Sequence, residues 1–482
     1  MPAYFVSKFT NFYPSRRETK LLFHGVTGAL DEVSPHLAKL LHQTRSQSNP
    51  ITDQNVSETD ITLLVSRGHL TIYPPTEEQT KYEEYVAALH SKRREVKSSY
   101  VMIIPSYSCN LRCPYCFQNS LRDDSRFPGL RSMVPSFAEM LFKRTIPNLL
   151  GSNYNRMHLT LYGGEPFTKD NYLAIATVLK YTQQRDHQVT AITNGTNVHL
   201  FPEFFGPEMG LVSGVQISLD GPKHLHDKSR VPGCGGETFE TITKNAKLLA
   251  DNGVEVVLRV NVTTECGDYL SHLATELEER GLTGHPRIGA YCRAVHEVHT
   301  PSSQDKFPEV FTQWKLTHKM EELKLASFSS PLHRTCSSIN SSLDTENGVK
   351  LNRTSFCMQN RPSAFIFDQL GDVYGCYDEA GYRSLRIGEV DSDGVAQLND
   401  RYKINQTRTL ISHEPCRSML NWPNLRRGVL PWLAQQRNHF FQLLRLPKRS
   451  WLHAALSIFT RVEFPPPMIR ALACLNSQMW HP

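Results

Sequence analysis

Two patterns of apolar and polar positions alternate along the middle of the chain. Between residues 98 and 295, short apolar runs of strand length are separated by segments whose apolar residues recur every three or four positions. The second kind includes Tyr172–Gln184 and Phe239–Asn252, and Gly253 follows the latter as expected at a helix C-terminus. The strand-like runs are Tyr100–Ile104, Met157–Tyr162, Val189–Ile192, Val212–Leu219, Val254–Val262 and Arg287–Tyr291.

Six strand and helix units in succession predict an α/β core over residues 97–300. Such a succession forms a parallel sheet with right-handed crossovers, either doubly wound or curled toward a barrel. The chemistry of these folds lies at the carboxyl ends of the strands. The residues that follow each apolar run are therefore the first candidates for a functional site.

Residues 1–96 have a different pattern and predict a small separate unit. A strand-like segment at Lys20–His24 precedes two segments with helical spacing, the second at Ile61–Val65, and a strand-like end at Leu70–Ile72. Two helices followed by a short β element are typical of a winged helix. We interpret the charged run Ser91–Glu95 as a solvated connection to the core.

Three cysteines with the spacing C-x3-C-x2-C follow the first predicted strand of the core. Cys109, Cys113 and Cys116 lie on one loop, and the next cysteine along the chain is Cys234. A closed zinc site needs four ligands, whereas three thiolates suit a cubane iron–sulfur cluster with one open iron. A zinc site and three buried structural cysteines are the alternatives that the spacing leaves open.

The triplet, with Tyr115 just before its last cysteine, resembles the signature of radical S-adenosylmethionine (SAM) enzymes. The resemblance implies a partial (βα)6 barrel in which Cys109, Cys113 and Cys116 hold a 4Fe-4S cluster. In that family the open iron is chelated by the amine and carboxylate of S-adenosyl-L-methionine. Reductive cleavage then gives methionine and a 5′-deoxyadenosyl radical, and it needs an electron donor such as ferredoxin or flavodoxin.

Motifs at the next three strand ends agree with this resemblance. The first resembles the Gly-Gly-Glu-Pro motif of the family, whose strand-end carboxylate and carbonyls receive the methionine ammonium, and the second matches its Thr-Asn-Gly turn. The third motif implies that Ser218 and Asp220 lie near the ribose and carboxylate of SAM and that Arg230 pairs with a carboxylate. A plain turn and a surface charge are the alternatives for Asn194 and Arg230. The cofactor-binding candidates are Gly163, Gly164, Glu165, Pro166, Asn194, Ser218, Asp220 and Arg230.

A second set of cysteines predicts a small α+β C-terminal domain over residues 301–416. Cys357 and Cys376 are spaced as at the opening of a SPASM domain, the auxiliary-cluster extension of radical SAM enzymes that modify peptides and proteins. Cys416 is the third candidate ligand. A small zinc site or free thiols are the alternatives at the first two positions.

The family pattern continues after Cys416 with three cysteines that this chain lacks. Met419, Leu425 and Val429 stand in their places, so auxiliary 4Fe-4S clusters are expected for the family but are not fully ligated here. Codons of these three residues that end in TG, each followed by a C, become TGC when read one base later. We hypothesise one extra base near codon 417, which makes residues 417–482 an out-of-frame, poorly folded tail. A diverged natural terminus is the alternative.

The charge of the chain changes at the same point. The net charge of +6 comes from 53 basic and 47 acidic side chains, but residues 417–482 contain nine Lys or Arg and a single acid, Glu463. Residues 1–416 therefore carry a net charge of −2. The tail also contains four of the five tryptophans. A nucleic-acid partner, suggested by a basic, Trp-rich patch, is not expected of the folded part.

The remaining composition predicts a cytoplasmic protein without a membrane partner. No run approaches 18 apolar residues, and the first 17 residues lack the apolar core of a secretory signal. Eleven cysteines, an odd number, argue against a disulfide framework.

The predicted substrate is a ribosomally made precursor peptide or a protein. SPASM members of the family include sulfatase maturases, which form formylglycine, and peptide maturases whose N-terminal winged helix grips a leader peptide by strand addition. The unit at 1–96 favours a peptide maturase. Sulfatase maturases have a catalytic Asp immediately after the second auxiliary cysteine, whereas here Tyr377 stands there and Asp378 follows as the candidate catalytic residue. A catalytically impaired peptide-binding remnant is the further alternative.

Overall fold

The computed structural model describes residues 3–14, 19–24, 26–27, 29–52, 55–93, 99–123, 127–155, 157–185, 187–295 and 358–409, with residues 316, 319, 320, 322, 323 and 328. It divides into two compact units. The N-terminal unit contains Met1–Glu95, and the core unit contains Val96–Pro331 and Met358–Thr407. Cys357, Cys416 and the tail at 417–482 lie outside the described residues.

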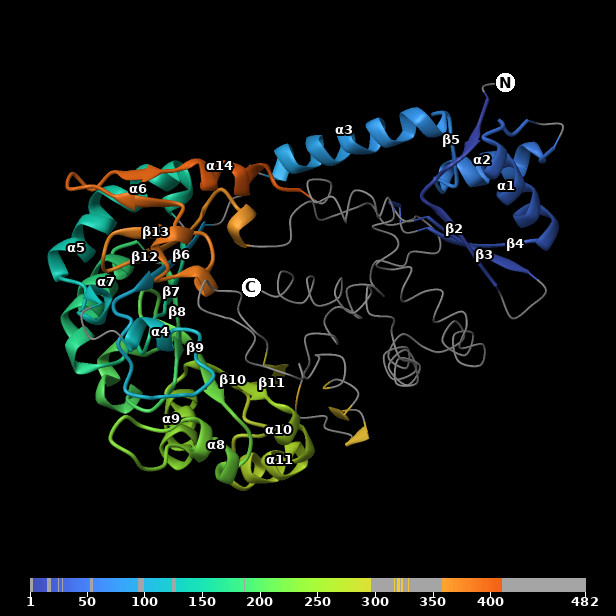
Figure 1. Cartoon of the computed structure of the whole chain (residues 1–482). Helices are drawn as coiled ribbons and strands as arrows, with labels where there is room; N and C mark the ends of the chain where they lie inside the picture. The colour runs from blue at the N-terminus through green and yellow to red at the C-terminus, as the bar shows by residue number, and fades with distance from the viewer. Residues whose placement is uncertain are drawn as a thin grey trace. The chain divides into compact units, whose positions relative to one another are not determined.

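A sheet that has ten strands in the described part of the chain organises the core unit (Figure 1). Six of its strands are parallel to their neighbours and follow one another in sequence order, which confirms the predicted α/β class and parallel sheet. These strands are β6 (Ser99–Ile104), β7 (Met157–Leu161), β8 (Gln188–Thr193), β9 (Val212–Leu219), β10 (Glu255–Val262) and β11 (Ile288–Ala294).

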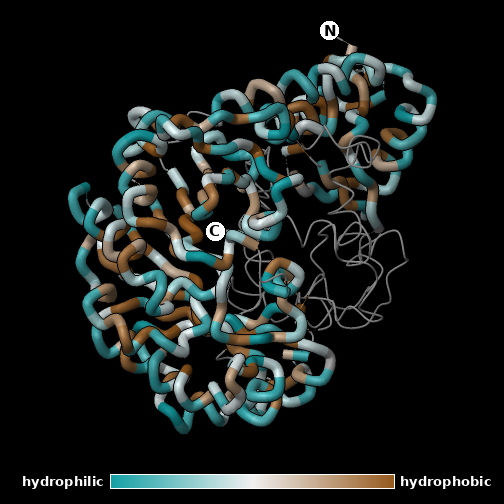
Figure 2. Tube along the Cα trace, turned by 60° about the vertical axis from the view of Figure 1, so that its left-hand side comes forward, coloured by the Kyte–Doolittle hydropathy of each residue, from teal (hydrophilic) through white to brown (hydrophobic). Residues whose placement is uncertain are grey.

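Helices cover one face of these strands, along the outer side of the arc that the strands form in Figure 1. The helix α9, for example, is amphipathic and buries Phe239, Ile242 and Leu249 against the sheet, and apolar and polar residues interleave along the trace in Figure 2. The helices are α4 (Asn119–Arg122), α5 (Pro135–Met140), α6 (Ile146–Leu150), α7 (Tyr172–Gln183), α8 (Lys223–Ser229), α9 (Phe239–Asp251), α10 (Thr264–Asp268) and α11 (Leu270–Glu279).

The other face of the parallel strands is polar and partly open. In β10, Val256, Leu258 and Val260 are buried under the helices, whereas the alternating Arg259 and Asn261 remain half-buried. The same alternation runs through β7, β8 and β9. Because successive side chains of a strand point to opposite faces, the half-buried set defines an inner face, and it carries the functional candidates at its carboxyl end.

The described strands after residue 358 join the core sheet, where the sequence predicts a separate small domain. Strand β12 (Ala364–Asp368) pairs in parallel with β6, and the antiparallel strands β13 (Asp372–Tyr374), β14 (Gly388–Val390) and β15 (Ala396–Leu398) follow it, before α14 (Asp400–Thr407). All five residues of β12 are buried. Their apolar side chains cover both faces at the β6 edge, which explains why this segment extends the existing sheet.

The N-terminal unit contains a three-stranded antiparallel sheet and three helices among its described residues. Sequence reasoning found only one strand of this sheet and missed the last helix, which continues to Arg93 through most of the charged run interpreted as a connection. No helix in the described part of the chain is long and apolar enough to cross a membrane. The elements are β1 (Phe5–Val6), β2 (Thr10–Pro14), β3 (Lys20–His24), β4 (Leu30–Val33), α1 (Pro35–Gln47), α2 (Glu58–Ser66), β5 (Leu70–Thr71) and α3 (Pro75–Arg93).

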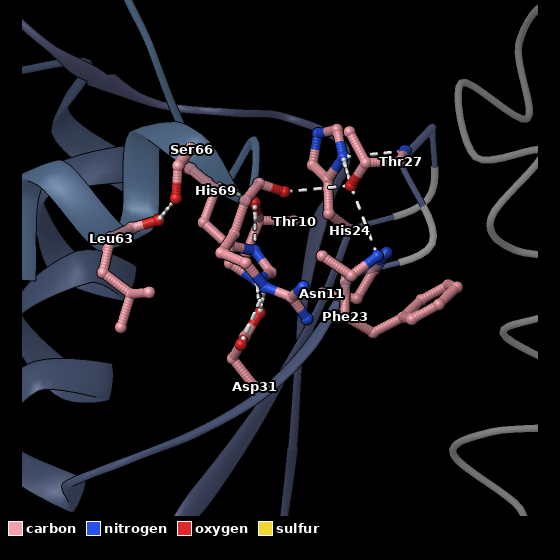
Figure 3. Close-up of polar contacts among 11 residues, drawn as sticks. Thr10, Asn11, Phe23, His24, Thr27, Asp31, Leu63, Ser66 and His69 are labelled. Atoms are coloured by element: carbon pink, nitrogen blue, oxygen red, sulfur yellow. Dashed lines mark hydrogen bonds and ion pairs between the residues drawn. The ribbon is translucent and has the colours of Figure 1, made fainter. Parts of the chain in front are cut away.

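A buried polar cluster ties the strands of this unit together (Figure 3). His69 lies between Thr10 and Asp31, with 3.2 Å from its Nδ1 to the Thr10 Oγ1 and 2.9 Å from its Nε2 to an Asp31 carboxylate oxygen. His24 contacts the hydroxyl groups of Ser7 and Thr27 at 3.1 and 2.9 Å. Thr10 and His69 are both fully buried, so this serial arrangement of hydroxyl, imidazole and carboxylate stabilises the unit and offers no accessible nucleophile.

This cluster predicts that the N-terminal unit loses stability as the pH falls below about 6.5. Burial, reinforced by His69, lowers the pKa of His24 to about 3. A histidine of the unfolded chain takes up its proton near pH 6.5, so between these two values the unfolded state binds more protons, and stability falls by up to about 1.4 kcal/mol per pH unit. Pulsed hydrogen exchange of the full chain at pH 7.5 and 5.5 measures the effect. His24→Gln should flatten the pH dependence, and an unchanged slope in that variant would refute the assignment.

Candidate functional site

The loop after β6 carries the cysteine triplet and is held in place by backbone hydrogen bonds. Cys113 is buried, and Cys109 and Cys116 are half-buried. The Arg112 N–H donates to the Val231 carbonyl at 2.8 Å, and the Gly233 N–H donates to the Asn110 carbonyl at 2.9 Å. The segment after α8 therefore braces the loop, and the three thiols come from one rigid turn of chain.

The glycine pair after β7 packs directly against the start of this loop. The Gly164 N–H donates to the Ser106 carbonyl at 3.0 Å, and the Glu165 N–H donates to the Ser108 carbonyl at 2.8 Å. A Cβ atom on Gly163 would lie 2.4 Å from the Ser106 oxygen, and one on Gly164 would lie 2.1 Å from the Ser108 oxygen. Only glycine allows this approach, and the buried Pro166 closes the turn.

Glu165 is fully buried, and its carboxylate binds other parts of the protein. It accepts hydrogen bonds from the Thr193 hydroxyl at 2.7 Å, the Asn194 N–H at 2.7 Å and the Phe167 N–H at 3.0 Å. Burial raises the pKa of Glu165 and these donors reduce the shift. These hydrogen bonds join the ends of β7 and β8 through the carboxylate that, by the resemblance, receives the methionine ammonium.

Asn194 connects the end of β8 to the cysteine loop. Its Nδ2 donates to the Asn110 Oδ1 at 2.8 Å and lies 3.9 Å from the Cys109 sulfur. Its Oδ1 accepts hydrogen bonds from the N–H and the hydroxyl of Thr196 at 2.9 and 2.7 Å. The Thr-Asn-Gly turn is thus more than a chain reversal, because its side chain orients the first cysteine.

The ends of β9 and β10 meet the loop through the Tyr115 hydroxyl. This hydroxyl donates to the Asp220 Oδ2 at 2.5 Å and accepts from the Arg230 guanidinium at 2.9 Å. Asn261 donates to the Asp220 Oδ1 at 3.1 Å, and Arg230 lies 3.6 Å from the same oxygen. Ser218 lies two residues before Asp220 on the same face of β9. Among the nominated residues, Asp220 and Arg230 are therefore paired and buried.

Sequence reasoning missed Asn261 and used Tyr115 only as an aromatic marker. A signal for the first existed: Asn261 and Arg259 are polar residues at alternate positions of a Val-rich strand, which is the pattern of an inner face that is not filled by apolar packing. No comparable signal pointed to the hydroxyl of Tyr115, because its partners Asp220 and Arg230 lie more than 100 residues away along the chain.

Arg230 has an unsatisfied donor that fits an anionic ligand. Its side chain is 8% exposed, and its Nε has no hydrogen-bond partner among the described residues. Burial opposes its charge, but Tyr115 and Asp220 outweigh burial and raise the pKa of Arg230. A buried, permanently charged donor without a partner is costly. The carboxylate of SAM would satisfy it with the geometry that a guanidinium prefers.

The donor set of the loop fits a cubane cluster better than a single metal ion. Burial raises the pKa of Cys113 to about 11, with Cys116 and Cys109 close enough to contribute to the shift. Within the described residues, no three His, Cys, Asp or Glu side chains converge on one point that could hold a metal ion. A cubane distributes three thiolates over three iron atoms, so its ligands need not converge on one point.

Asp378 lies on the inner side of the sheet, away from the cysteine loop in sequence. It belongs to the turn Tyr377–Glu379 that follows the buried Cys376, and the Tyr377 ring packs on Tyr162 with ring centroids 5.5 Å apart. Burial raises the pKa of Asp378 to about 6, and Arg293 and Arg259 oppose the shift. Asp378 is therefore within electrostatic range of Arg259 in β10 and Arg293 in β11.

Residues 103–273 match the family model of the Radical SAM superfamily. They include the cysteine loop, the glycine turn, the Asn194 turn and the Asp220 network described above. This chain contains a radical SAM domain. Members of this family use a 4Fe-4S cluster and SAM, the two groups to which the thiols and Arg230 are suited.

Curated proteins align with the radical SAM domain and with parts of the chain beyond it. The chain is 24% identical over 352 residues to a cysteine-type anaerobic sulfatase-maturating enzyme of Clostridium perfringens, covering 68% of this chain and 87% of the relative. It is 23% identical over 292 residues to the radical SAM cyclopropyl synthase TigE of Paramaledivibacter caminithermalis, covering 55% and 59%. The chain thus spans little more than half of the second relative.

Solved structures also align with the chain. Native anSMEcpe with bound AdoMet gives a TM-score of 0.45 at 18% identity, covering 78% of this chain and 99% of that one. Streptococcus suis SuiB gives a TM-score of 0.41 at 16% identity, covering 78% and 84%.

Tyr115→Phe should weaken SAM binding by the radical SAM domain about tenfold. The change keeps the ring but removes the hydroxyl that links Asp220 to Arg230, and a hydrogen bond to a charged group contributes about 1.5–3 kcal/mol. Equilibrium binding of SAM to the reconstituted protein measures the loss. Tyr269→Phe, which alters an exposed tyrosine of the same unit, is the control and should leave binding unchanged.

Proposed function

We propose that this chain cleaves SAM reductively at a 4Fe-4S cluster and uses the resulting radical to modify a peptide or protein. The observation that carries the proposal is the convergence of four strand ends. Hydrogen bonds join the cysteine loop after β6 to the Gly163-Gly164 turn, to Asn194 and to the network of Asp220 and Arg230.

Each group of residues has a distinct task in this proposal. Cys109, Cys113 and Cys116 would hold the cluster, which supplies the electron for cleavage of SAM when it is bound. Gly163 and Gly164 let the backbone approach the ligand, and Glu165 and Asn194 position the loop. Asp220 and Tyr115 fix Arg230, which would bind the carboxylate of SAM, and Ser218 lies beside the expected place of its ribose.

Formation of 5′-deoxyadenosine tests the proposal. The full chain is reconstituted anaerobically with iron and sulfide, then incubated with SAM and dithionite. We expect 5′-deoxyadenosine and methionine in equal amounts, with the physiological electron donor a ferredoxin or flavodoxin in the cytoplasm. A protein that holds the cluster but does not cleave SAM would refute the enzymatic proposal. The alternative of a catalytically impaired peptide-binding protein would then remain.

A peptide or protein substrate is supported by the position of Asp378. Its carboxyl group lies at the inner face beside two arginines, and not on the outer surface of the sheet. We propose it as the catalytic base at the stage after hydrogen abstraction.

The sulfatase-maturase alternative, which forms formylglycine, is favoured by the names of two relatives. Incubation with a Cys-containing sulfatase peptide, followed by a mass measurement, separates the two.

We propose that the N-terminal unit binds the leader segment of a precursor peptide in the manner of a winged helix. The order β2-β3-β4 leaves the backbone groups of β2 and β4 at the edges of the sheet within the described residues. An extended peptide adds to such an edge through main-chain hydrogen bonds. Hydrogen exchange of the full chain with a short peptide encoded beside the gene should protect β2 or β4, and absence of protection in both contradicts the proposal.

We propose that the auxiliary clusters are incomplete in this chain. Cys376 is buried after β13, and the companion candidates Cys357 and Cys416 lie outside the described residues. The out-of-frame origin of residues 417–482 is tested at the nucleotide level. If codon 425 is not CTG, or if the shifted frame stops before codon 429, the hypothesis fails.

A further inference from the structure

Two arginines on the inner face of the core sheet have no task in the cleavage of SAM. In the β10–β11 pairing, Arg259 lies opposite Tyr291, and Asn261 lies opposite Arg293. All four residues are at alternate positions of parallel neighbouring strands, so they share one face. Asn261 contacts the Asp220 network, so both arginines lie next to the proposed SAM site. Arg259 is two residues before Asn261 in β10, and Arg293 lies opposite Asn261 in the neighbouring strand β11.

The positive charge of this pair is not neutralised by the described residues. The Arg259 Nε donates to the neutral Asn261 Oδ1 at 3.1 Å, and neither guanidinium forms an ion pair with a carboxylate in the described part of the chain. Arg293 is 7% exposed. Burial and the nearby Arg259 lower the pKa of Arg293, while Asp378 contributes a single opposing charge to both. One buried and one half-buried cation within electrostatic range of one carboxylate leave an excess of positive charge.

Neighbouring polar groups do not offset this excess. The Tyr291 side chain, which lies opposite Arg259 in the register, donates its hydroxyl hydrogen to the Gln216 Oε1 at 2.9 Å and so offers no negative charge to the arginines. Tyr162 and Tyr377, which lie near Arg259, are neutral at ordinary pH because burial raises the pKa of each. A bound anion would stabilise such an uncompensated charge in a half-buried site.

We propose that Arg259 and Arg293 form a binding site for a carboxylate of the substrate, an Asp or Glu side chain or a peptide C-terminus, beside Asp378. This proposal rests on the proposed function, because it names the substrate class of that site. Guanidinium groups bind carboxylates in a bidentate manner, which fixes orientation as well as position. The carboxylate would hold the substrate with its neighbouring carbon facing the SAM network at Asp220.

The carboxylate could come from SAM itself, and the experiment separates the two sources. The reconstituted full chain is saturated with SAM without reductant and titrated calorimetrically with N-acetyl-glutamic acid amide and with its neutral analogue N-acetyl-glutamine amide. We expect the acid to bind at least about tenfold more tightly than the neutral analogue. Arg259→Gln and Arg293→Gln should each remove this preference while leaving the affinity for SAM unchanged.

Matched variants guard against loss of folding. Arg287→Gln, at the other end of β11 where Arg287 pairs with Glu255, removes an exposed arginine and should keep the preference. Arg293→Lys keeps the positive charge and should retain part of the preference for the acid probe. Equal binding of the two probes by the wild type overturns the proposal, as does a preference that survives in both glutamine variants.

A preference that vanishes when SAM saturates the protein assigns the arginines to the SAM carboxylate and also overturns the proposal. Because neither titration needs turnover, its outcome is independent of 5′-deoxyadenosine formation. A chain that forms 5′-deoxyadenosine without discriminating the probes refutes only this inference. A chain that binds the acid probe but does not cleave SAM refutes only the proposed function.

Discussion

Cys113→Ala abolishes formation of 5′-deoxyadenosine by the reconstituted protein. Loss of an outer-sphere partner of a metal site costs about 10- to 100-fold, so loss of a ligand should exceed about 100-fold. Cys113 is the buried member of the triplet, and its neighbours Cys109 and Cys116 belong to the same braced loop. With two thiolates remaining, the cluster has no third protein ligand on the loop, and the visible absorption of the reconstituted protein should fall together with the activity.

Cys234→Ala is the matched control for this variant. Cys234 directly follows Gly233, whose N–H donates to the loop at Asn110, but it is exposed, and its sulfur takes part in no contact with the triplet in the described residues. The control should bind iron and cleave SAM as the wild type does. Equal activity of Cys113→Ala and Cys234→Ala would show that the triplet does not hold the cluster, and the zinc or structural alternatives for these thiols would then regain support.

Gly164→Ala is expected to remove SAM-dependent activity without unfolding the core. The new Cβ atom would lie 2.1 Å from the Ser108 carbonyl oxygen and 2.3 Å from the Tyr107 carbonyl oxygen. Both are backbone atoms that no change of rotamer can displace, so the start of the cysteine loop must move. Overpacking of this kind costs about 3 kcal/mol, which corresponds to about 100-fold in SAM binding or cluster retention.

Gly289→Ala tests whether the effect of Gly164→Ala is local. Gly289 lies in β11 of the same sheet, and a Cβ atom there meets no heavy atom within 4 Å among the described residues. The control should keep both iron content and SAM affinity. Retention of full activity in Gly164→Ala would mean that the glycine turn does not support the site.

Local patterns determined the α/β class and the strands of the core. The apolar runs before Cys109, Glu165, Asn194 and Asp220 are long and bounded by turns, and they became four adjacent parallel strands. Because the carboxyl ends of such strands meet at one edge, motifs separated by more than 100 residues could be assigned to one site before any coordinates were known.

Sequence patterns were weaker where the elements are short or their partners distant. Strands β2 and β4 of the N-terminal unit were missed because polar residues interrupt their apolar positions, whereas β3 contains the apolar run Leu21–Phe23. The position of β12 could not be predicted either, because an apolar run such as Ala364–Phe367 does not indicate which sheet edge it will join.

The sequence by itself determined the chemistry that this protein can attempt: three thiols on one loop, glycines where the backbone must approach it, and an acid and an arginine at a further strand end. Only the tertiary structure decided how these groups are used. It commits the Glu165 carboxylate to three internal donors, couples Arg230 to Tyr115, and places Arg259 and Arg293 beside Asp378. The physical reason is that residue type and spacing specify what a side chain can bind, whereas charge balance and hydrogen-bond satisfaction depend on neighbours that strand pairing brings from distant parts of the chain.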